Sequence, residues 1–265
     1  MPIGDILSRF SSLELSSADN KKYSIKMNPF NRIALKIIGL PHLGFRMRAR
    51  LIMKLLKNIK SKTILDAGCG YGIYSLMTAE RGNKVYAMDI DKDRIKRIEK
   101  MLEEDRELGK KIILKVGSIA NIPFKEGVFD AIICSEVIEH IDEDKKAFEE
   151  LSRVLKKDGI LVLSLPSKSD NNLDTYKKFG HKRAGYSVED VGRIGERFGL
   201  KIEKVYSYEH ALGSFLFNTF NKLNNKIVIG ALFYIFFFFY LIDFALKIGQ
   251  ENGNIFLLRK INQNN

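Results

Sequence analysis

The middle of the chain alternates short apolar runs with longer amphipathic segments. Runs of strand length occur at residues 62–67, 83–89, 111–116, 128–134, 159–165, 200–208 and 254–259. Segments typical of helices lie between them, at residues 72–81, 91–108, 142–155 and 187–198. Strands that alternate with helices predict an α/β fold, in which a doubly wound, mostly parallel sheet is covered on both faces.

The last two predicted strands are separated by an apolar segment too long for a hairpin loop. Residues 211–250 hold nine of the 18 Phe, and residues 227–242 carry no charge. A helix over those 16 residues is only about 24 Å long, short of the roughly 30 Å bilayer core. One crossing would also separate the last strand from its sheet partner. We expect a helical insert that lies on or partly in a membrane surface, with a buried core helix as the alternative.

Charge is concentrated at the start of the chain. The protein has 265 residues and a net charge of +12, and residues 1–61 hold 12 Lys or Arg against three acids. A composition of 45% hydrophobic and 29% charged residues excludes a disordered chain, a collagen-like repeat and a polytopic membrane protein. A basic segment favours an anionic partner, such as phospholipid, nucleic acid or a phosphorylated substrate, although it also fits a solvated face without a partner.

These patterns divide the chain into four predicted segments. They are a basic helical N-terminal cap at 1–61, a core at 62–210, the apolar insert at 211–250, and the last strand and tail at 251–265. Two cysteines, Cys69 and Cys134, cannot form a disulfide framework and indicate a reducing compartment. The first residues lack the features of a signal peptide. We therefore expect a cytoplasmic protein, peripheral or monotopic on the cytosolic face of a membrane.

A glycine-rich loop follows the first core strand. Gly68, Gly70 and Gly72 allow a tight turn and a close approach of the backbone to a ligand. The spacing differs from the nicotinamide fingerprint, and the loop alone also fits a plain strand–helix turn. Asp89 ends the second strand, which places it beside this loop in a doubly wound sheet. A carboxylate there can bind both hydroxyls of a ribose. The loop and Asp89 therefore predict a ligand that contains a nucleoside, and a nicotinamide cofactor would also explain Asp89.

Further motifs follow in order along the chain. Residues 117–119 follow the third strand, FDAIICSEVIEH spans residues 129–140, and RVLKKDG spans residues 153–159. Together with ILDAGCGYG and AMDID, they resemble the class I S-adenosylmethionine-dependent methyltransferases, specifically the type-11 small-molecule group, over about residues 60–167. The resemblance implies a Rossmann-like sheet of seven strands with an antiparallel last strand, and S-adenosylmethionine as cofactor.

The resemblance also implies the residues that bind the cofactor. The methionine part would lie against Asp66, Gly68, Gly70 and Gly72, the ribose against Asp89, the adenine against Ile90, Ser118 and Ile119, and the sulfonium near Ser135. Ser118 stands where many members have Asp. Arg48 lies at a spacing where related enzymes place an arginine on the cofactor carboxylate, and a surface arginine is the alternative. No metal ligand is predicted.

Candidate acceptor-side residues follow the fourth and fifth core strands. A base is needed only if the acceptor arrives protonated, and His140 is the best candidate, with Glu136 and Glu139 nearby. Packing at the helix start is the alternative for His140. The loop before residue 187 carries His181, Arg183 and Tyr186, which could hold an acceptor. Alternatively, Tyr186 and Ser187 only pack and cap the following helix.

The favoured interpretation is methyl transfer to a small, lipid-like or membrane-bound acceptor. An RNA methyltransferase that uses the basic N-terminal region is the first alternative. It is less favoured because CSEVIE, not an Asn-Pro-Pro-Tyr-type motif, follows the fourth strand. A catalytically silent binding module and a nicotinamide-dependent reductase are the others. The sequence leaves the acceptor atom and the oligomeric state open.

Overall fold

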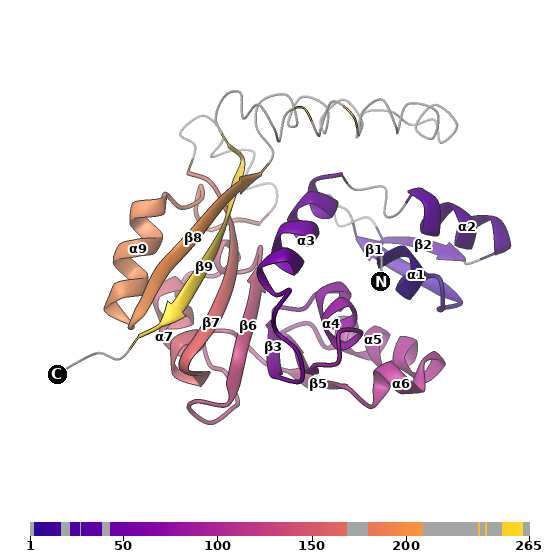
Figure 1. Ribbon diagram of the computed structural model, residues 1–265, viewed down its shortest axis with the longest axis horizontal. Helices are drawn as coiled ribbons and strands as arrows, with labels where there is room; N and C mark the ends of the chain where they lie inside the picture. Colours follow the sequence, from indigo (N-terminus) through magenta and orange to yellow (C-terminus); the bar gives the residue numbers. More distant parts are fainter. Residues whose placement is uncertain are drawn as a thin grey trace.

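A seven-stranded sheet forms the centre of the computed structural model, which describes residues 3–16, 22–26, 28–38, 43–168, 180–208, 238, 242 and 251–261 (Figure 1). The strand order is β5-β4-β3-β6-β7-β9-β8. The strands are β3 (Thr63–Ala67), β4 (Lys84–Asp89), β5 (Ile112–Val116), β6 (Phe129–Ser135), β7 (Leu155–Pro166), β8 (Leu200–Tyr208) and β9 (Gly253–Lys260).

The pairing confirms the predicted sheet. Strands β5, β4, β3, β6 and β7 are parallel, and β9 runs antiparallel between β7 and β8. The strand ends agree with the sequence prediction to within one residue except at β7, which begins at Leu155 rather than at residue 159. Leu155 pairs with Phe129 while Ile160 pairs with Ala131, so β7 carries extra residues there, and Asp158 has φ 60°. This irregularity places charged residues in the strand, which is why the apolar pattern missed its start.

Helices cover both faces of the sheet. Along β6, Ile132 and Cys134 pack with α7 (Asp144–Val154) and α9 (Val188–Arg197). Ala131 and Ile133 point to the opposite face and pack with α3 (Leu43–Leu55). On that opposite face, α1 (Ile3–Leu7), α4 (Ile73–Ala79) and α5 (Lys92–Glu104) cover β4. Burial of alternate residues on both faces explains the continuous apolar run of β6.

The N-terminal region contains more than the predicted helices. Strands β1 (Ser12–Ser16) and β2 (Lys22–Lys26) form an antiparallel pair, followed by α2 (Pro29–Ile38). The purely helical cap predicted for residues 1–61 is therefore corrected. Both strands alternate apolar and polar residues, the period of a strand. In addition, Ile52 and Leu56 are buried against the central sheet, so part of this region completes the core.

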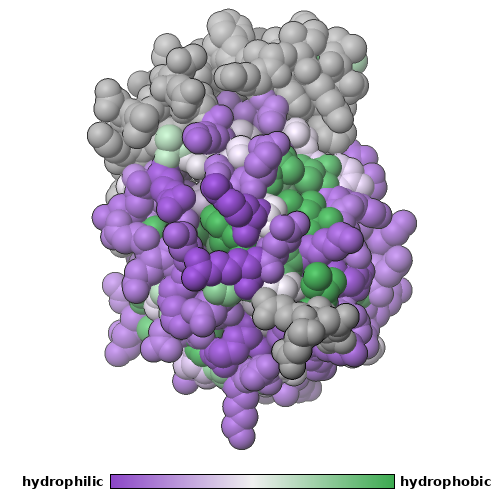
Figure 2. Space-filling model, turned by 90° about the vertical axis from the view of Figure 1, so that its left-hand side faces the viewer, coloured by the Kyte–Doolittle hydropathy of each residue, from purple (hydrophilic) through white to green (hydrophobic). Residues whose placement is uncertain are grey.

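The sheet edge at β8 is charged. Lys201, Glu203 and Lys204 are exposed along it, and the face on that side is largely hydrophilic, with a smaller hydrophobic area (Figure 2). Charged edge strands discourage pairing with another chain.

The predicted apolar insert at 211–250 lies outside the described residues, apart from Phe238 and Ile242. Within the described ranges, no helix has both the length and the apolar character needed to cross a membrane. Cys69 and Cys134 are both buried and form no disulfide.

Candidate active site

The glycine loop lies at the carboxyl ends of β3 and β4. Gly68, Gly70 and Gly72 have φ values of 77°, 56° and 75°, in the left-handed region that favours glycine. At Gly68 a Cβ would also lie 2.5 Å from a methyl carbon of Val137. At Gly70 a Cβ would meet nothing within 4 Å. The loop is thus packed tightly at its start and open at Gly70, as a backbone that receives a ligand requires.

Asp89 is held against this loop, as the topology predicts. Its Oδ2 accepts a hydrogen bond of 2.8 Å from the backbone N–H of Gly70, and its Oδ1 accepts one of 2.9 Å from Asp91. Because a carboxylate offers about four acceptor positions, capacity remains for the two hydroxyls of a ribose. The neighbouring Ile90 side chain is 74% exposed, unusual for an isoleucine and suited to an adenine ring.

Asp66 is buried beneath the loop. The Ser75 hydroxyl donates a hydrogen bond of 2.5 Å to its carboxylate. Burial raises the pKa of Asp66 to about 7, against the opposing effect of the Ser75 hydrogen bond. A cationic ligand group nearby would favour the ionised form, so the site suits the ammonium of an amino acid moiety.

The loop after β5 carries the two remaining predicted adenine contacts. The Ser118 hydroxyl accepts a hydrogen bond of 3.2 Å from the Ala120 N–H and is only partly buried. Ile119 is 5% exposed and packs in the core, which leaves its backbone for a ligand.

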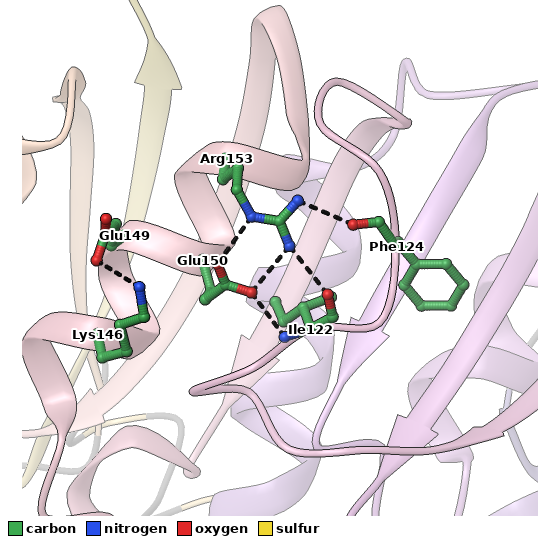
Figure 3. Close-up of polar contacts among 6 residues, drawn as sticks. All are labelled: Ile122, Phe124, Lys146, Glu149, Glu150 and Arg153. Atoms are coloured by element: carbon green, nitrogen blue, oxygen red, sulfur yellow. Dashed lines mark hydrogen bonds and ion pairs between the residues drawn. The ribbon is translucent and has the colours of Figure 1, made fainter.

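Two residues of α7 fix this loop (Figure 3). Arg153 donates hydrogen bonds of 2.9 Å to the carbonyl oxygens of Ile122 and Phe124. Glu150 accepts one of 2.7 Å from the Ile122 N–H and also pairs with Arg153. The backbone around Ser118 is therefore restrained from the helix, which the RVLKKDG motif alone did not reveal.

Arg48 lies in a polar network with Glu136. One guanidinium nitrogen is 3.2 Å from Glu136 Oε2. The hydroxyls of Tyr208 and Ser164 donate to Glu136 Oε1 at 3.0 and 2.9 Å. Glu136 itself has φ 56°. The network joins α3, β6, β7 and β8, so Arg48 and Glu136 hold each other in place beside the site. The Arg48–cofactor contact and the catalytic role of Glu136 remain predictions.

The Ser135 hydroxyl is buried beside that of Tyr74, at the end of β6. Burial is the largest cause that raises the Tyr74 pKa. The contact of Ser135 with the cofactor remains a prediction.

The structure brings together His140 and His181, which lie 41 positions apart. Their rings are 4.7 Å apart and nearly perpendicular. His140 Nδ1 is 3.3 Å from the Gly180 carbonyl oxygen, and Nε2 is 3.9 Å from Glu139 Oε1. Burial lowers the pKa of His181, and the neighbouring His140 adds to this effect. Glu139, which the sequence marked only as a neighbour of His140, is completely buried, and burial raises its pKa well above the usual range.

Arg183 and Tyr186 both contact the carboxylate of Asp144. Arg183 is partly exposed and lies 3.1 Å from the Asp144 carboxylate. Tyr186 is 1% exposed, and its hydroxyl donates to Asp144 at 3.2 Å. The structure therefore gives Tyr186 a packing role rather than a surface open to an acceptor. Ser187 and Asp190 form a capping box at the start of α9, which accounts for this segment locally.

Comparison with known proteins agrees with this geometry. Residues 65–163 match the methyltransferase domain family. Over this range the chain is similar in sequence to S-adenosylmethionine-dependent methyltransferases, and its core has their fold. The match begins within β3 and ends within β7, and so contains the glycine loop, Asp89 and the segment that ends at His140.

Curated relatives match the same part of the chain. An uncharacterized protein of Methanocaldococcus jannaschii is 34% identical over 118 residues, 44% of this chain and 47% of that protein. The ubiquinone biosynthesis O-methyltransferase of Pelagibacter ubique is 34% identical over 44% of this chain and 45% of its own. The chain thus spans about half the length of these curated relatives.

Solved structures share the fold. A putative sarcosine dimethylglycine methyltransferase from Galdieria sulphuraria is similar with a TM-score of 0.66 and 17% identity, over 89% of this chain and 98% of that one. Geranyl diphosphate C-methyltransferase from Streptomyces coelicolor, solved with Mg²⁺, geranyl diphosphate and S-adenosyl-L-homocysteine, has a TM-score of 0.64 and 17% identity over 82% and 79%.

Proposed function

We propose that this protein transfers the methyl group of S-adenosylmethionine to a small-molecule acceptor. The observation that carries the proposal is the joined pair of Gly70 and Asp89, next to the exposed Ile90. It combines an open backbone, a ribose-binding carboxylate and an apolar surface for the adenine, in a domain of the methyltransferase family.

The cofactor, when bound, supplies a methyl group already activated on a sulfonium. The residues of this chain therefore need only bind the cofactor, align the acceptor and exclude water. The buried Asp66 would meet the ammonium, Asp89 the ribose, and Ile90 with the Ser118 backbone the adenine. The Arg48–Glu136 network would close the side of the site at α3.

The acceptor would lie beside the segment that ends at His140. His140 is partly exposed, and its Nδ1 is oriented by the Gly180 carbonyl oxygen. Its Nε2 is then the atom that could take a proton from a hydroxyl acceptor. Arg183 lies further along the same loop and, with part of its side chain exposed, could meet an anionic group.

We further propose that the acceptor is lipid-like and that the protein works at the cytosolic face of a membrane. The support is compositional: residues 211–250 are rich in Phe, and residues 1–61 carry an excess of nine positive charges. The names of the relatives do not agree on one class of acceptor, since one is a ubiquinone biosynthesis O-methyltransferase and another a norajmaline N-methyltransferase.

The test is to incubate the full chain with methyl-labelled S-adenosylmethionine and a total extract of its host, then separate organic, aqueous and nucleic-acid fractions. We expect label in the organic fraction. Label in the aqueous fraction supports methyl transfer but contradicts the lipid-like acceptor. Label in RNA favours the nucleic-acid alternative. The variant Asp89→Asn serves as the background, because it lacks the ribose carboxylate but preserves shape.

A further inference from the structure

Three side chains next to the cofactor site form a cluster suited to a metal ion. Glu139 and His140 belong to the short helix η1 (Ile138–His140), which follows β6, and His181 comes from the segment before α9. One ligand atom from each lies within 4.8 Å of the others. The chemistry of the set, two imidazole nitrogens and a carboxylate, is that of a divalent-metal site.

The environment of Glu139 distinguishes this cluster from a chance grouping of side chains. The Glu139 side chain is 0% exposed, and neither carboxylate oxygen has a hydrogen-bond partner in the part of the chain that the structure describes. A buried polar group without a partner is costly. A metal ion bound at the cluster would give these oxygens the partner that the protein does not provide.

His140 is oriented as a metal ligand. The Gly180 carbonyl oxygen lies 3.3 Å from Nδ1 and can accept its proton, which leaves the lone pair on Nε2. Nε2 is the nitrogen that faces Glu139. A backbone carbonyl that fixes the second ring nitrogen is typical of metal-binding histidines. The loop is fixed as well, because the Lys182 N–H donates a hydrogen bond of 2.7 Å to the Glu139 carbonyl oxygen.

We propose that Glu139, His140 and His181 bind one divalent metal ion of the borderline class that includes Zn²⁺, Mn²⁺ and Fe²⁺. Two nitrogen ligands favour these ions over Mg²⁺ and Ca²⁺, which prefer oxygen. Metal–ligand bonds of about 2.1 Å place ligand atoms about 3–4 Å apart, so side chains whose ligand atoms now lie within 4.8 Å of one another would move together by about 1 Å on binding. Three protein ligands leave a position open, and the partial exposure of His140 indicates that this position faces outward.

The role of the ion rests on the proposed function. An acceptor hydroxyl at the open position would have a lowered pKa and would lose its proton to water. Its oxygen then forms the new O–C bond while the C–S bond of the sulfonium breaks and the electron pair stays on sulfur. His140 would in this case be a ligand rather than the general base.

The first test measures metal binding alone. The full chain is treated with chelator, desalted and titrated with Co²⁺, whose visible absorption reports nitrogen and oxygen ligands, and then with Zn²⁺ in competition. We expect one equivalent to bind, and we expect Glu139→Gln and His181→Asn to lower the affinity at least about tenfold, the lower range for disturbed metal sites. Asp142→Asn is the matched control, since Asp142 is an exposed carboxylate three residues from Glu139.

Folding of each variant is checked by thermal unfolding and by binding of S-adenosylhomocysteine, which the cluster should not affect. Absence of Co²⁺ and Zn²⁺ binding to the wild-type chain, or equal binding by folded Glu139→Gln, would overturn the metal site.

A second assay separates the site from its role. Methyl transfer that is lost with chelator and restored by Zn²⁺ or Mn²⁺ supports the role in the reaction. Transfer that persists unchanged in chelator overturns that role. If the metal binds but no methyl transfer occurs with any fraction of the extract, the proposed function fails while the metal site stands.

Discussion

The backbone N–H of Gly70 donates a 2.8 Å hydrogen bond to Oδ2 of Asp89, and so joins the glycine loop after β3 to the end of β4. One side chain thereby shapes the loop and presents its remaining acceptor positions to a ligand. Asp89→Asn keeps the size of the side chain but replaces an acceptor by a donor. We expect the affinity for S-adenosylhomocysteine to fall about 10- to 100-fold, as for hydrogen bonds to a charged group.

Calorimetric titration measures this change. The control is Asp93→Asn, which removes an exposed carboxylate of α5 outside the ligand site. Equal affinity of Asp89→Asn and the wild-type chain would contradict the ribose assignment.

Alanine substitutions at Gly68 and Gly82 distinguish the cost of a left-handed backbone from the cost of a steric clash. Both glycines have positive φ, 77° and 88°, but only at Gly68 would a Cβ collide with Val137. Gly82→Ala should lower the free energy of unfolding by about 1–2 kcal/mol, the left-handed cost. Gly68→Ala should lower the free energy of unfolding by about 1–3 kcal/mol more than Gly82→Ala does, because the new Cβ overpacks the site. Urea unfolding measures both, and Gly68→Ala with Val137→Ala should recover part of the loss. Equal losses in the two single variants would disprove the conflict.

The Arg48–Glu136 pair should behave as a coupled unit. Arg48→Met leaves the Glu136 carboxylate with only its hydroxyl donors, and we expect a loss of about 1.5–3 kcal/mol of unfolding free energy. Glu136→Gln in the same chain removes the charge left behind. The double variant should therefore lose less than the sum of the two single variants, by at least about 0.5 kcal/mol. Strict additivity in chemical unfolding would show that the pair contributes nothing.

Asp66 makes the stability of the ligand-free protein depend on pH. Its pKa is about 7 in the folded protein, because burial disfavours the carboxylate, against an ordinary value of 3.8. Between these values the folded state holds more protons than the unfolded state. The protonated Asp66 side chain therefore contributes its full stabilisation below about pH 4, and this stabilisation is lost as the pH rises toward 7.

The loss should amount to at most about 4 kcal/mol, from 1.36 kcal/mol per pKa unit. Asp66→Asn removes this titration, so the difference in unfolding free energy between wild type and variant should change between pH 4 and 7. A pH-independent difference would contradict a raised Asp66 pKa.

The two α7 ion pairs in Figure 3, Arg153–Glu150 and Lys146–Glu149, should contribute unequally to the free energy of unfolding. Arg153→Met removes the donors to Ile122 and Phe124 and leaves Glu150 without its cation, so we expect a loss of about 2–3 kcal/mol. Lys146→Met removes only a half-exposed pair with Glu149 and should cost less than about 0.5 kcal/mol. Thermal unfolding compares the two variants, and a larger effect at Lys146 would contradict this ranking.

Local pattern predicted most of the sheet because the central strands β3, β6, β7 and β9 are bounded by turn residues and mostly buried on both faces. Parallel topology then placed Asp89 beside Gly70, as observed. The β1–β2 pair was missed because short alternating segments are weak signals beside the excess of basic residues.

Contacts between segments far apart in the chain could not be predicted from the local sequence pattern. Arg48 and Glu136 come from α3 and the end of β6, and no sequence spacing relates them. The approach of His181 to His140 likewise depends on how the segment before α9 returns over η1. Burial of Tyr186 follows from its bond to Asp144, 42 positions earlier. Each of these positions depends on packing of the whole chain rather than on local preference.

Titration of the full chain with S-adenosylmethionine, with NADH as the comparison ligand, tests the central claim most directly. The account predicts saturable binding of S-adenosylmethionine at one site and no binding of NADH under the same conditions. Binding of NADH without S-adenosylmethionine would contradict it, because the glycine loop and Asp89 would then serve a nicotinamide cofactor.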